Sequence, residues 1–240
     1  MKKQDFAFAG LLLVIILTFL PFDFLADYHK DFLFNSKYWA ATSFLKFAIL
    51  ATLGECIGLR ITKGIYSYKG FGLIPRAIVW GILGVGIQIA FVVFSVGSPV
   101  VLEKFVGVNN SIASMQQTDI LAAFENNLGV ERLLSAFSIS ILLNLIFAPV
   151  FMTLHKITDT HIINNGGTVS GFLSPIKYKE IFPALNWKVQ WNFVFKKTIP
   201  FFWIPMHTIT FLLPGEYRIV FAAVLGVALG IILAIANLKK

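Results

Sequence analysis

Long blocks of apolar residues, each close to the thickness of a lipid bilayer, dominate this 240-residue chain. A helix needs about 20 mainly apolar residues to cross the hydrocarbon core of a membrane. Hydrophobic residues make up 57% of the chain and charged residues 13%, whereas soluble domains contain about 25% charged residues. The sequence therefore predicts a single transmembrane domain over residues 1–240 rather than a soluble enzyme.

Six of these blocks are candidates for membrane segments. All six are expected to be helices, because a segment isolated in lipid has to satisfy its own backbone hydrogen bonds. The fifth is short and contains Pro200, Pro205 and Pro214, so we expect it to be kinked or partly re-entrant. The predicted fold is an all-α polytopic transmembrane helical bundle with segments at roughly 6–27, 41–61, 76–100, 133–154, 199–214 and 217–238.

Lysine and arginine residues are unevenly distributed between the connections. If both termini are cytoplasmic, fourteen lie on the inner side, five on the outer side, and Lys46 lies within the second segment. Cytoplasmic loops carry such an excess of positive charge, so the count favours six segments and cytoplasmic termini. The inner residues are Lys2, Lys3, Arg60, Lys63, Lys69, Arg76, Lys156, Lys177, Lys179, Lys188, Lys196, Lys197, Lys239 and Lys240, and the outer residues are Lys30, Lys37, Lys104, Arg132 and Arg218.

The first segment resembles a signal peptide in outline but has no small-x-small cleavage site, so we expect it to be retained. It also lacks the arginine- and serine-rich composition of a mitochondrial transit peptide, which favours a bacterial plasma membrane. The net charge of +8 comes from short loops rather than one soluble face, so no nucleic-acid partner is expected. A single cysteine, Cys56, excludes an internal disulfide framework.

Two connections contain local structural signals. In the outer loop 105–131, Asp119 occupies a helix-start position before an apolar face, which predicts a short interfacial helix. In the inner loop 155–198, Asn165-Gly166-Gly167 predicts a turn. The aromatic and basic stretch that follows is typical of contact with the cytoplasmic leaflet.

Glu55 is an acidic residue in the middle of the second segment, on a stripe of small and polar residues. An acid at this depth costs about 2.5–3.5 kcal/mol on insertion scales, so it has to be protonated, paired or next to water. Two interpretations stay open. Glu55 lines a pore or proton-linked site, or it forms a buried pair that locks helices together, with Arg76 or Arg218 as a basic partner.

Other polar and small residues follow the same helical spacing. Gln88, Asn144 and His207 could line a narrow polar cavity together with Glu55. Small residues at this spacing ordinarily serve close helix packing. The packing candidates are Gly54, Gly58, Gly226 and Gly230.

No catalytic or nucleotide-binding signature occurs in the sequence: H-E-x-x-H, G-x-S-x-G, the P-loop and G-x-G-x-x-G are all absent. The spacing of His155, Asp159 and His161 matches no zinc pattern. We therefore expect no catalytic residues, no metal site and no cofactor.

The segment 202–218 reads FWIPMHTITFLLPGEYR and precedes the last, glycine-striped apolar block. It resembles the Trp-Pro, Asn-Phe, Val-Pro and Arg signature of the family that includes the mitochondrial inner-membrane Mpv-seventeen protein and the twenty-two-kilodalton peroxisomal membrane protein. Thr210 replaces the usual asparagine, and Glu55 replaces an aspartate of the family. Supporting matches are Gly54-Glu55, Arg76 before a glycine-rich segment, and Phe147-Ala148-Pro149.

The resemblance covers roughly residues 40–238 and implies a bacterial-type, extended member of a family of small helical membrane proteins. Channel-like permeability has been proposed for eukaryotic members of that family, without a settled substrate. It adds Arg218 and His207 of the signature segment to the functional candidates. The predicted function is a small non-enzymatic pore, channel or membrane-homeostasis factor. The alternatives are a membrane-embedded enzyme acting on a lipid or isoprenoid, and a structural or assembly partner without a pore. Expected partners are the lipid bilayer and small solutes or ions, and a homo-oligomer stays open.

Overall fold

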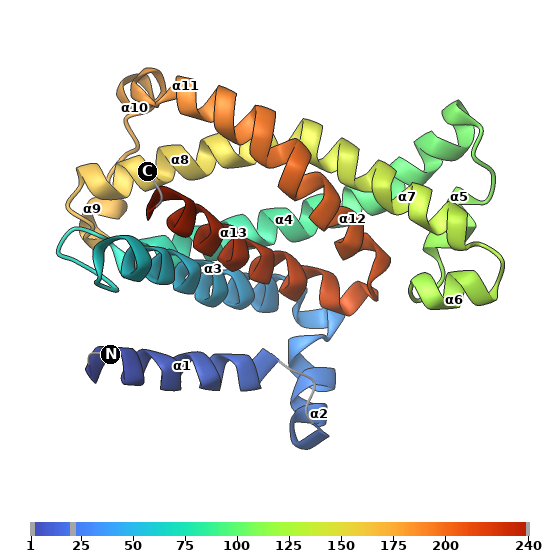
Figure 1. Ribbon diagram of the computed structural model, residues 1–240, viewed down its shortest axis with the longest axis horizontal. Helices are drawn as coiled ribbons and strands as arrows, with labels where there is room; N and C mark the ends of the chain where they lie inside the picture. The colour runs from blue at the N-terminus through green and yellow to red at the C-terminus, as the bar shows by residue number, and fades with distance from the viewer. Residues whose placement is uncertain (1–2, 20–22, 239–240) are drawn as a thin grey trace. The chain divides into compact units, whose positions relative to one another are not determined.

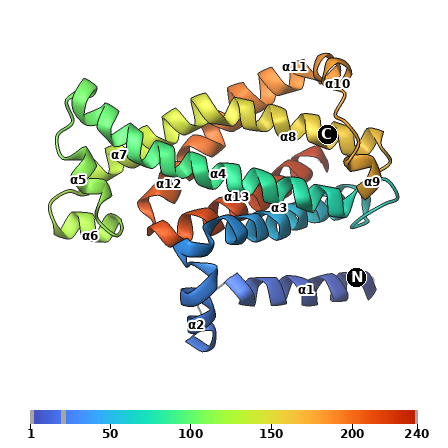
Figure 2. The same ribbon diagram turned by 180° about the vertical axis from the view of Figure 1, so that it is seen from behind.

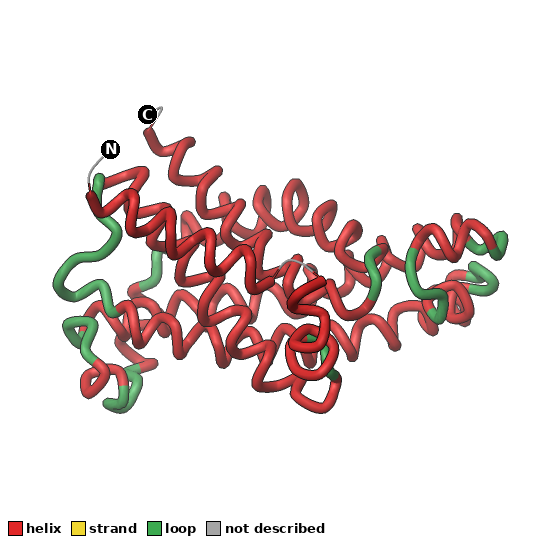
Figure 3. Tube along the Cα trace, turned by 90° about the horizontal axis from the view of Figure 1, so that it is seen from below, coloured by secondary structure: helices red, strands yellow, loops and turns green. Residues whose placement is uncertain are grey.

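The structure is a computed structural model that describes residues 3–19 and 23–238. These residues are 85% helical and form no strand (Figure 3), which confirms the all-α fold class. The chain divides into two compact units, Met1–Thr42 and Ser43–Lys240, here called unit 1 and unit 2.

Unit 1 contains the first apolar block. Its long helix α1 covers Lys3–Phe19 and is almost entirely apolar after its first turn. The imidazole Nε2 of His29 lies 2.9 Å from the carbonyl oxygen of Thr18, which connects α1 to the turns that follow. Residues 20–22 of the expected 6–27 segment lie outside the described residues. The later turns are η1 (Asp23–Leu25), α2 (Ala26–Tyr28), the π-helical η2 (His29–Leu33) and η3 (Ser36–Tyr38).

Unit 2 consists of long helices that run lengthwise beside one another (Figures 1 and 2). Two of them are composite, because a π-helical stretch continues directly into the next α-helix. The long helices are α3 (Trp39–Lys63, which belongs to unit 2 from Ser43 onward), α4 (Leu73–Val101), α7–η5–α8 (Gly129–Leu142, Leu143–Phe147, Ala148–Asn164), α11–η6–α12 (Trp187–Val189, Gln190–Trp203, Ile204–Leu212) and α13 (Arg218–Leu238).

Three helical segments among the described residues are long and apolar enough to cross a membrane: Leu73–Val106, Gly129–Asn164 and Gly215–Ile235. They coincide with the third, fourth and sixth predicted segments. The helix α3, predicted as the second segment, is not one of these three, and it carries Lys46 and Glu55 along its length. The apolar stretch Gln4–Phe19 in unit 1 is shorter than the three.

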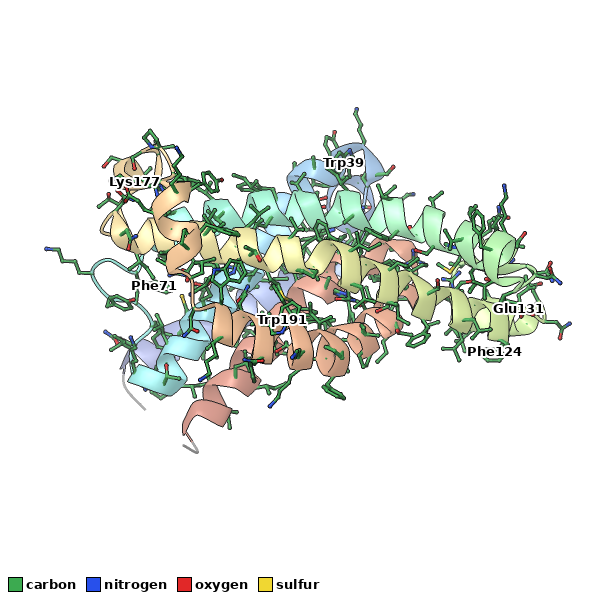
Figure 4. All side chains as sticks on the ribbon, turned by 90° about the horizontal axis from the view of Figure 1, so that it is seen from above. Trp39, Phe71, Phe124, Glu131, Lys177 and Trp191 are labelled. Atoms are coloured by element: carbon green, nitrogen blue, oxygen red, sulfur yellow. The ribbon has the colours of Figure 1, made fainter. Side chains whose placement is uncertain are left out.

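The connections of unit 2 gather at its two ends (Figure 1). We call them the α10 end and the α6 end. Figure 4 places Phe71 and Lys177 at the α10 end, and Phe124 and Glu131 at the α6 end. The α10 end carries residues 64–72, α9 (Val169–Phe172) and α10 (Tyr178–Ala184), and the α6 end carries η4 (Leu102–Val106), α5 (Ser111–Met115), α6 (Ile120–Glu125) and η7 (Gly215–Tyr217).

The predicted helix start at Asp119 is confirmed. Its carboxylate accepts hydrogen bonds from the backbone N–H groups of Leu121 and Ala122, at 2.8 and 3.0 Å, at the beginning of α6. These bonds satisfy two of the donors that a helix leaves free at its N-terminus. The sequence did not indicate the second short helix, α5, that precedes α6.

The predicted turn after α8 is also confirmed, and it has a packing role. Gly166 and Gly167 both adopt positive φ angles, 69° and 67°. A Cβ atom on Gly167 would lie 2.5 Å from the carbonyl oxygen of Gly70, and one on Gly72 would lie 3.0 Å from the Cα of Gly167. Only glycines allow this approach, and it joins the connection before α4 to the connection after α8.

The helix that contains most of the fifth predicted segment is longer than the segment itself. Instead of a short helix over 199–214, one continuous helix begins at Trp187 and ends at Leu212. The Asn186 side chain accepts a hydrogen bond from the N–H of Val189 at its start, at 3.1 Å. Prolines do not interrupt it, because Pro205 lies in the first turn of α12 and Pro200 lies in the π-helical stretch. A proline inside a helix removes one backbone hydrogen bond and crowds the preceding turn, and π-helical stretches already depart from α-helical hydrogen bonding.

Candidate functional site

Unit 2 contains a cavity of about 410 Å³, which we call the chamber. All five long helices of unit 2 contribute to its wall. Along η5 and α8 the lining runs from Leu143 to Lys156, which corresponds to about 20 Å at the helical rise of 1.5 Å per residue. The chamber is therefore long and narrow, and it follows the direction of the helices.

The wall of the chamber is mainly apolar and aromatic. Small residues of α3 and α13, such as Ala51 and Gly226, leave its central space open. Polar side chains occur at two levels, one towards the α10 end and one deeper in unit 2. The aromatic lining residues other than tryptophan and histidine are Phe47, Phe91, Phe147, Phe151 and Phe193.

At the α10 end, Glu55 meets two partners from α4. Its Oε2 accepts a hydrogen bond from Nη1 of Arg76 at 2.6 Å, within an ion pair. Its Oε1 accepts one from the indole Nε1 of Trp80 at 2.7 Å. Nε2 of His155 on α8 lies 3.7 Å from the same Oε1, and the His155 and Trp80 rings stack at a centroid distance of 4.2 Å.

Arg76 joins this carboxylate to a second one. Its Nη2 forms an ion pair with Oδ1 of Asp159 on α8, while its Nε donates to the carbonyl oxygen of Phe71 at 2.7 Å. Lys156 adds an ion pair to Oδ2 of Asp159 at 3.0 Å. The guanidinium thus connects α3, α4 and α8, and we call Glu55, Arg76, Trp80, His155 and Asp159 the ion cluster.

The Lys156 side chain is 50% exposed and also lines the chamber. Arg76 is only 8% exposed. The chamber therefore reaches the protein surface near Lys156, and the ion cluster lies beside that opening. A charged group near the opening keeps contact with water, which lowers the cost of placing two carboxylates and a guanidinium in a helical bundle.

The deeper polar level is formed by Asn144, His207 and Trp203, which we call the deep cluster. Asn144 is fully buried, and its Nδ2 donates to the carbonyl oxygen of Ser140 at 2.8 Å. The same nitrogen lies 3.1 Å from Nδ1 of His207. The His207 ring lies against the indole of Trp203 at a centroid distance of 5.1 Å.

Beyond the deep cluster, towards the α6 end, the helices are tightly packed. Phe91 lines the chamber and its ring contacts His207 and Phe211, at centroid distances of 5.5 and 4.8 Å. Thr210 and Phe211 of α12 and Ile139 of α7 are fully buried. The described lining thus ends at the level of the deep cluster.

Three of the five predicted functional residues line this one chamber: Glu55, Asn144 and His207. Gln88 is half-buried on α4 and is not part of the lining. Arg218 lies at the start of α13, where its Nε donates to the carbonyl oxygen of Leu213 at 3.1 Å. The structure brings the first three together and places the other two elsewhere.

Sequence reasoning missed several residues of these clusters as functional candidates. Trp80, Trp203 and Asp159 each contribute through a contact between helices that a single sequence does not reveal. The sequence predicts Arg76 as a basic partner for Glu55 if that acid is paired. Among the described residues there is no group of side chains arranged to hold a metal ion.

The four glycines predicted to serve helix packing fall into two kinds. A Cβ atom on Gly54 would lie 3.0 Å from the Cα of Val227, and one on Gly230 would lie 3.5 Å from the carbonyl oxygen of Gly54. The Gly58 position is 3.9 Å from the carbonyl oxygen of Gly230. Gly226, by contrast, faces nothing within 4 Å. The first three allow α3 and α13 to approach each other, whereas Gly226 keeps the chamber open.

These features define an all-helical protein with three helices suited to crossing a membrane and an apolar chamber with two polar levels. Comparison of the chain with known protein families, curated proteins and solved structures finds no match. The resemblance to the Mpv-seventeen family is not tested by these comparisons and stays a prediction.

Proposed function

We propose that this chain is an integral protein of a bacterial plasma membrane that crosses the bilayer six times, with both termini cytoplasmic. The six segments are α1, α3, α4, α7–α8, α11–α12 and α13. The arrangement of unit 2 supports this topology, because residues 64–72 and α10 lie at one end while α5 and α6 lie at the other (Figure 1). These are the connections that the charge count assigns to opposite sides of the membrane.

The lysines of the fifth segment fit this topology. Lys196 and Lys197 are exposed on η6, some way into the helix that begins at Trp187. Lys196 lies over the ring of Trp191 at 5.7 Å. Long basic side chains can extend towards the membrane interface while their stems cover apolar surface, so the first third of this helix can lie at the cytoplasmic leaflet.

Within this topology the proposed function is non-enzymatic transport, in which the chamber forms the cytoplasmic half of a path for a small solute. One observation carries the proposal: a partly open cavity of about 410 Å³, lined by all five long helices of unit 2, lies between them. A purely structural bundle would fill its small-residue stripes with packed side chains. The closed level beyond the deep cluster then acts as the barrier that a solute has to pass.

The channel-like permeability implied by the Mpv-seventeen resemblance agrees with this proposal. A membrane-homeostasis role and a homo-oligomeric assembly are compatible with the same chamber. No nucleic-acid partner is proposed, since the basic residues follow the membrane topology.

A membrane enzyme acting on a lipid or isoprenoid is the second candidate, because Glu55 and His207 line the same apolar chamber. Both oxygens of Glu55 already accept hydrogen bonds, from Arg76 and Trp80. A carboxylate held in this way is poorly placed to take a proton from a substrate, which favours transport. Turnover of added lipids or isoprenoids by purified protein in vesicles, lost in His207→Ala, would reverse that preference.

The test of transport is to plug the chamber without disturbing the packing. Gly226→Leu adds a side chain where a Cβ has no neighbour within 4 Å, inside the chamber. We expect it to reduce the flux of ions and small solutes from reconstituted vesicles to the level of protein-free vesicles. Gly86→Leu is the matched control, since Gly86 on α4 also has no neighbour within 4 Å but does not line the chamber. Equal flux through the two folded variants would contradict the proposal.

A further inference from the structure

Two buried polar atoms of the deep cluster have no hydrogen-bond partner. They are the amide oxygen Oδ1 of Asn144 and the indole nitrogen Nε1 of Trp203. Both residues line the chamber. Buried polar groups in folded proteins are nearly always paired, so an acceptor and a donor left open beside one cavity indicate a missing partner.

The surrounding contacts determine which atoms are open. The backbone carbonyl of Ser140 can only accept, so the nitrogen of the Asn144 amide faces it and the oxygen is the free atom. That same nitrogen lies 3.1 Å from Nδ1 of His207, which makes Nδ1 an acceptor. A neutral imidazole then carries its proton on Nε2. The deep cluster thus offers one open acceptor, Oδ1 of Asn144, and one open donor, Nε1 of Trp203, and neither is charged.

The ion cluster contains charged side chains, whereas the deep cluster contains none. Glu55 and Arg76 balance each other near the opening of the chamber. At the deeper level no carboxylate, lysine or arginine belongs to the described lining, so an ion bound there would lack a counter-charge in an apolar surrounding. A neutral group that both donates and accepts a hydrogen bond satisfies the open atoms without that cost.

We propose that the deep cluster binds the hydroxyl group of a neutral amphipathic molecule, whose apolar chain extends along the chamber towards the α10 end. A hydroxyl donates to Oδ1 of Asn144 and accepts from Nε1 of Trp203. The length of the chamber, about 20 Å at 1.5 Å per helical residue, and its aromatic wall suit an extended apolar chain. The inference deepens the proposed function, on which it rests, by naming the chemistry of the solute.

The experiment uses 1-dodecanol as the probe and dodecane as the probe without a hydroxyl group. Both are added to the purified full chain in lipid nanodiscs, and the melting temperature is measured. A ligand that binds only the folded state raises this temperature, so we expect 1-dodecanol to raise it by several degrees and dodecane to raise it much less. The difference between the two probes reports recognition of the hydroxyl group rather than general effects on the bilayer.

Two variants test the residues, and one serves as the control. Asn144→Leu removes the open acceptor, and Trp203→Phe removes the open donor while keeping an aromatic ring against His207. Each should abolish the difference between the probes. Gln88→Leu changes an amide on α4 outside the chamber and should keep it. The Trp203 variant keeps the test decisive if Asn144→Leu fails to fold.

Three outcomes would overturn the inference. Equal shifts of the melting temperature with both probes would mean that the chamber binds apolar chains without recognising the hydroxyl group. No shift with either probe would mean that water alone satisfies the open atoms. A probe difference retained in both variants would place the hydroxyl elsewhere. Solute flux blocked by Gly226→Leu would survive any of these results, so failure of this inference is distinguishable from failure of the transport proposal.

Discussion

The two ends of unit 2 bury arginine residues in opposite ways. At the α10 end, Arg76 is neutralised by Glu55 and Asp159. At the α6 end, Arg132 is fully buried and donates to the backbone carbonyls of Ser114 and Gln117, at 3.0 and 2.8 Å. Arg218 donates to the carbonyls of Leu213 and Phe211, at 3.1 and 3.3 Å.

This difference indicates that the buried arginines have different roles at the two ends of unit 2. Carboxylates give the α10 end a balanced cluster that faces an open chamber. At the α6 end, positively charged side chains lie at the C-termini of α5 and α12. Backbone carbonyls there accept their hydrogen bonds, and the helix dipole favours positive charge at this position. Arg132 and Arg218 both point a guanidinium at the Phe211 carbonyl, at 3.5 and 3.3 Å. We infer that charge is available for function at the α10 end and is used for cohesion at the α6 end.

The largest expected effect comes from removing the central cation of the ion cluster. Arg76→Gln leaves Glu55 and Asp159 facing each other without the guanidinium, and breaking a buried pair in this way costs about 3–5 kcal/mol. Thermal or chemical unfolding in detergent measures the loss. Restoration by the triple change Arg76→Gln, Glu55→Gln and Asp159→Asn would show that repulsion between the carboxylates is the cause. If Arg76→Gln were as stable as the unaltered chain, the ion cluster would not be a source of stability at the α10 end.

Glu55→Gln should have a smaller effect, because Arg76 keeps its pair with Asp159. Losing one charge-assisted hydrogen bond corresponds to about 1.5–3 kcal/mol. The same variant should change the ion selectivity of vesicle flux, since Glu55 lines the chamber. Combining it with Asp159→Asn in a double-mutant cycle measures the coupling through Arg76. Unchanged selectivity with a lowered melting temperature would leave Glu55 a structural role only.

The smallest effect is expected at the α6 end. Arg132→Met keeps an apolar stem but removes the hydrogen bonds to Ser114, Gln117 and Phe211. Because the change also removes a buried charge that has no carboxylate partner in these bonds, we expect a net cost of about 1–2 kcal/mol. The loss should be local, with faster amide exchange in α5 and α6 and unchanged solute flux. Hydrogen exchange followed by mass spectrometry distinguishes this from global loosening. A change in ion selectivity would contradict the separation between the two ends.

The sequence predicted the helical class and that Glu55 has to be protonated, paired or next to water, because both follow from the cost of polar groups in lipid. It did not predict which helix faces turn towards each other. Trp80, Ile87 and Phe91 of α4 line the chamber, whereas Gln88 does not. Successive residues in a helix are about 100° apart at 3.6 residues per turn, so the position next to Ile87 leaves the wall. The spacing of polar residues in the sequence does not determine how each helix is rotated about its own axis.

The fifth segment illustrates a second limit. Pro200, Pro205 and Pro214 together predict a kinked or partly re-entrant segment, although only Pro214 of the three lies beyond the helix, which ends at Leu212. The effect of a proline depends on whether its missing N–H was needed. That depends on the hydrogen-bonding pattern of the turn before it, which changes from π-helical to α-helical after Trp203.

The chamber also has a thermodynamic consequence. An empty void costs about 24 cal/mol per Å³ in a packed core, so 410 Å³ of vacuum would cost on the order of 10 kcal/mol. That equals the entire net stability of an ordinary domain, about 5–15 kcal/mol. Because the chamber also reaches the protein surface near Lys156, we expect water, lipid chains or solute to fill it instead of vacuum. Where lipid chains are the occupant, we expect their removal during purification to lower the melting temperature.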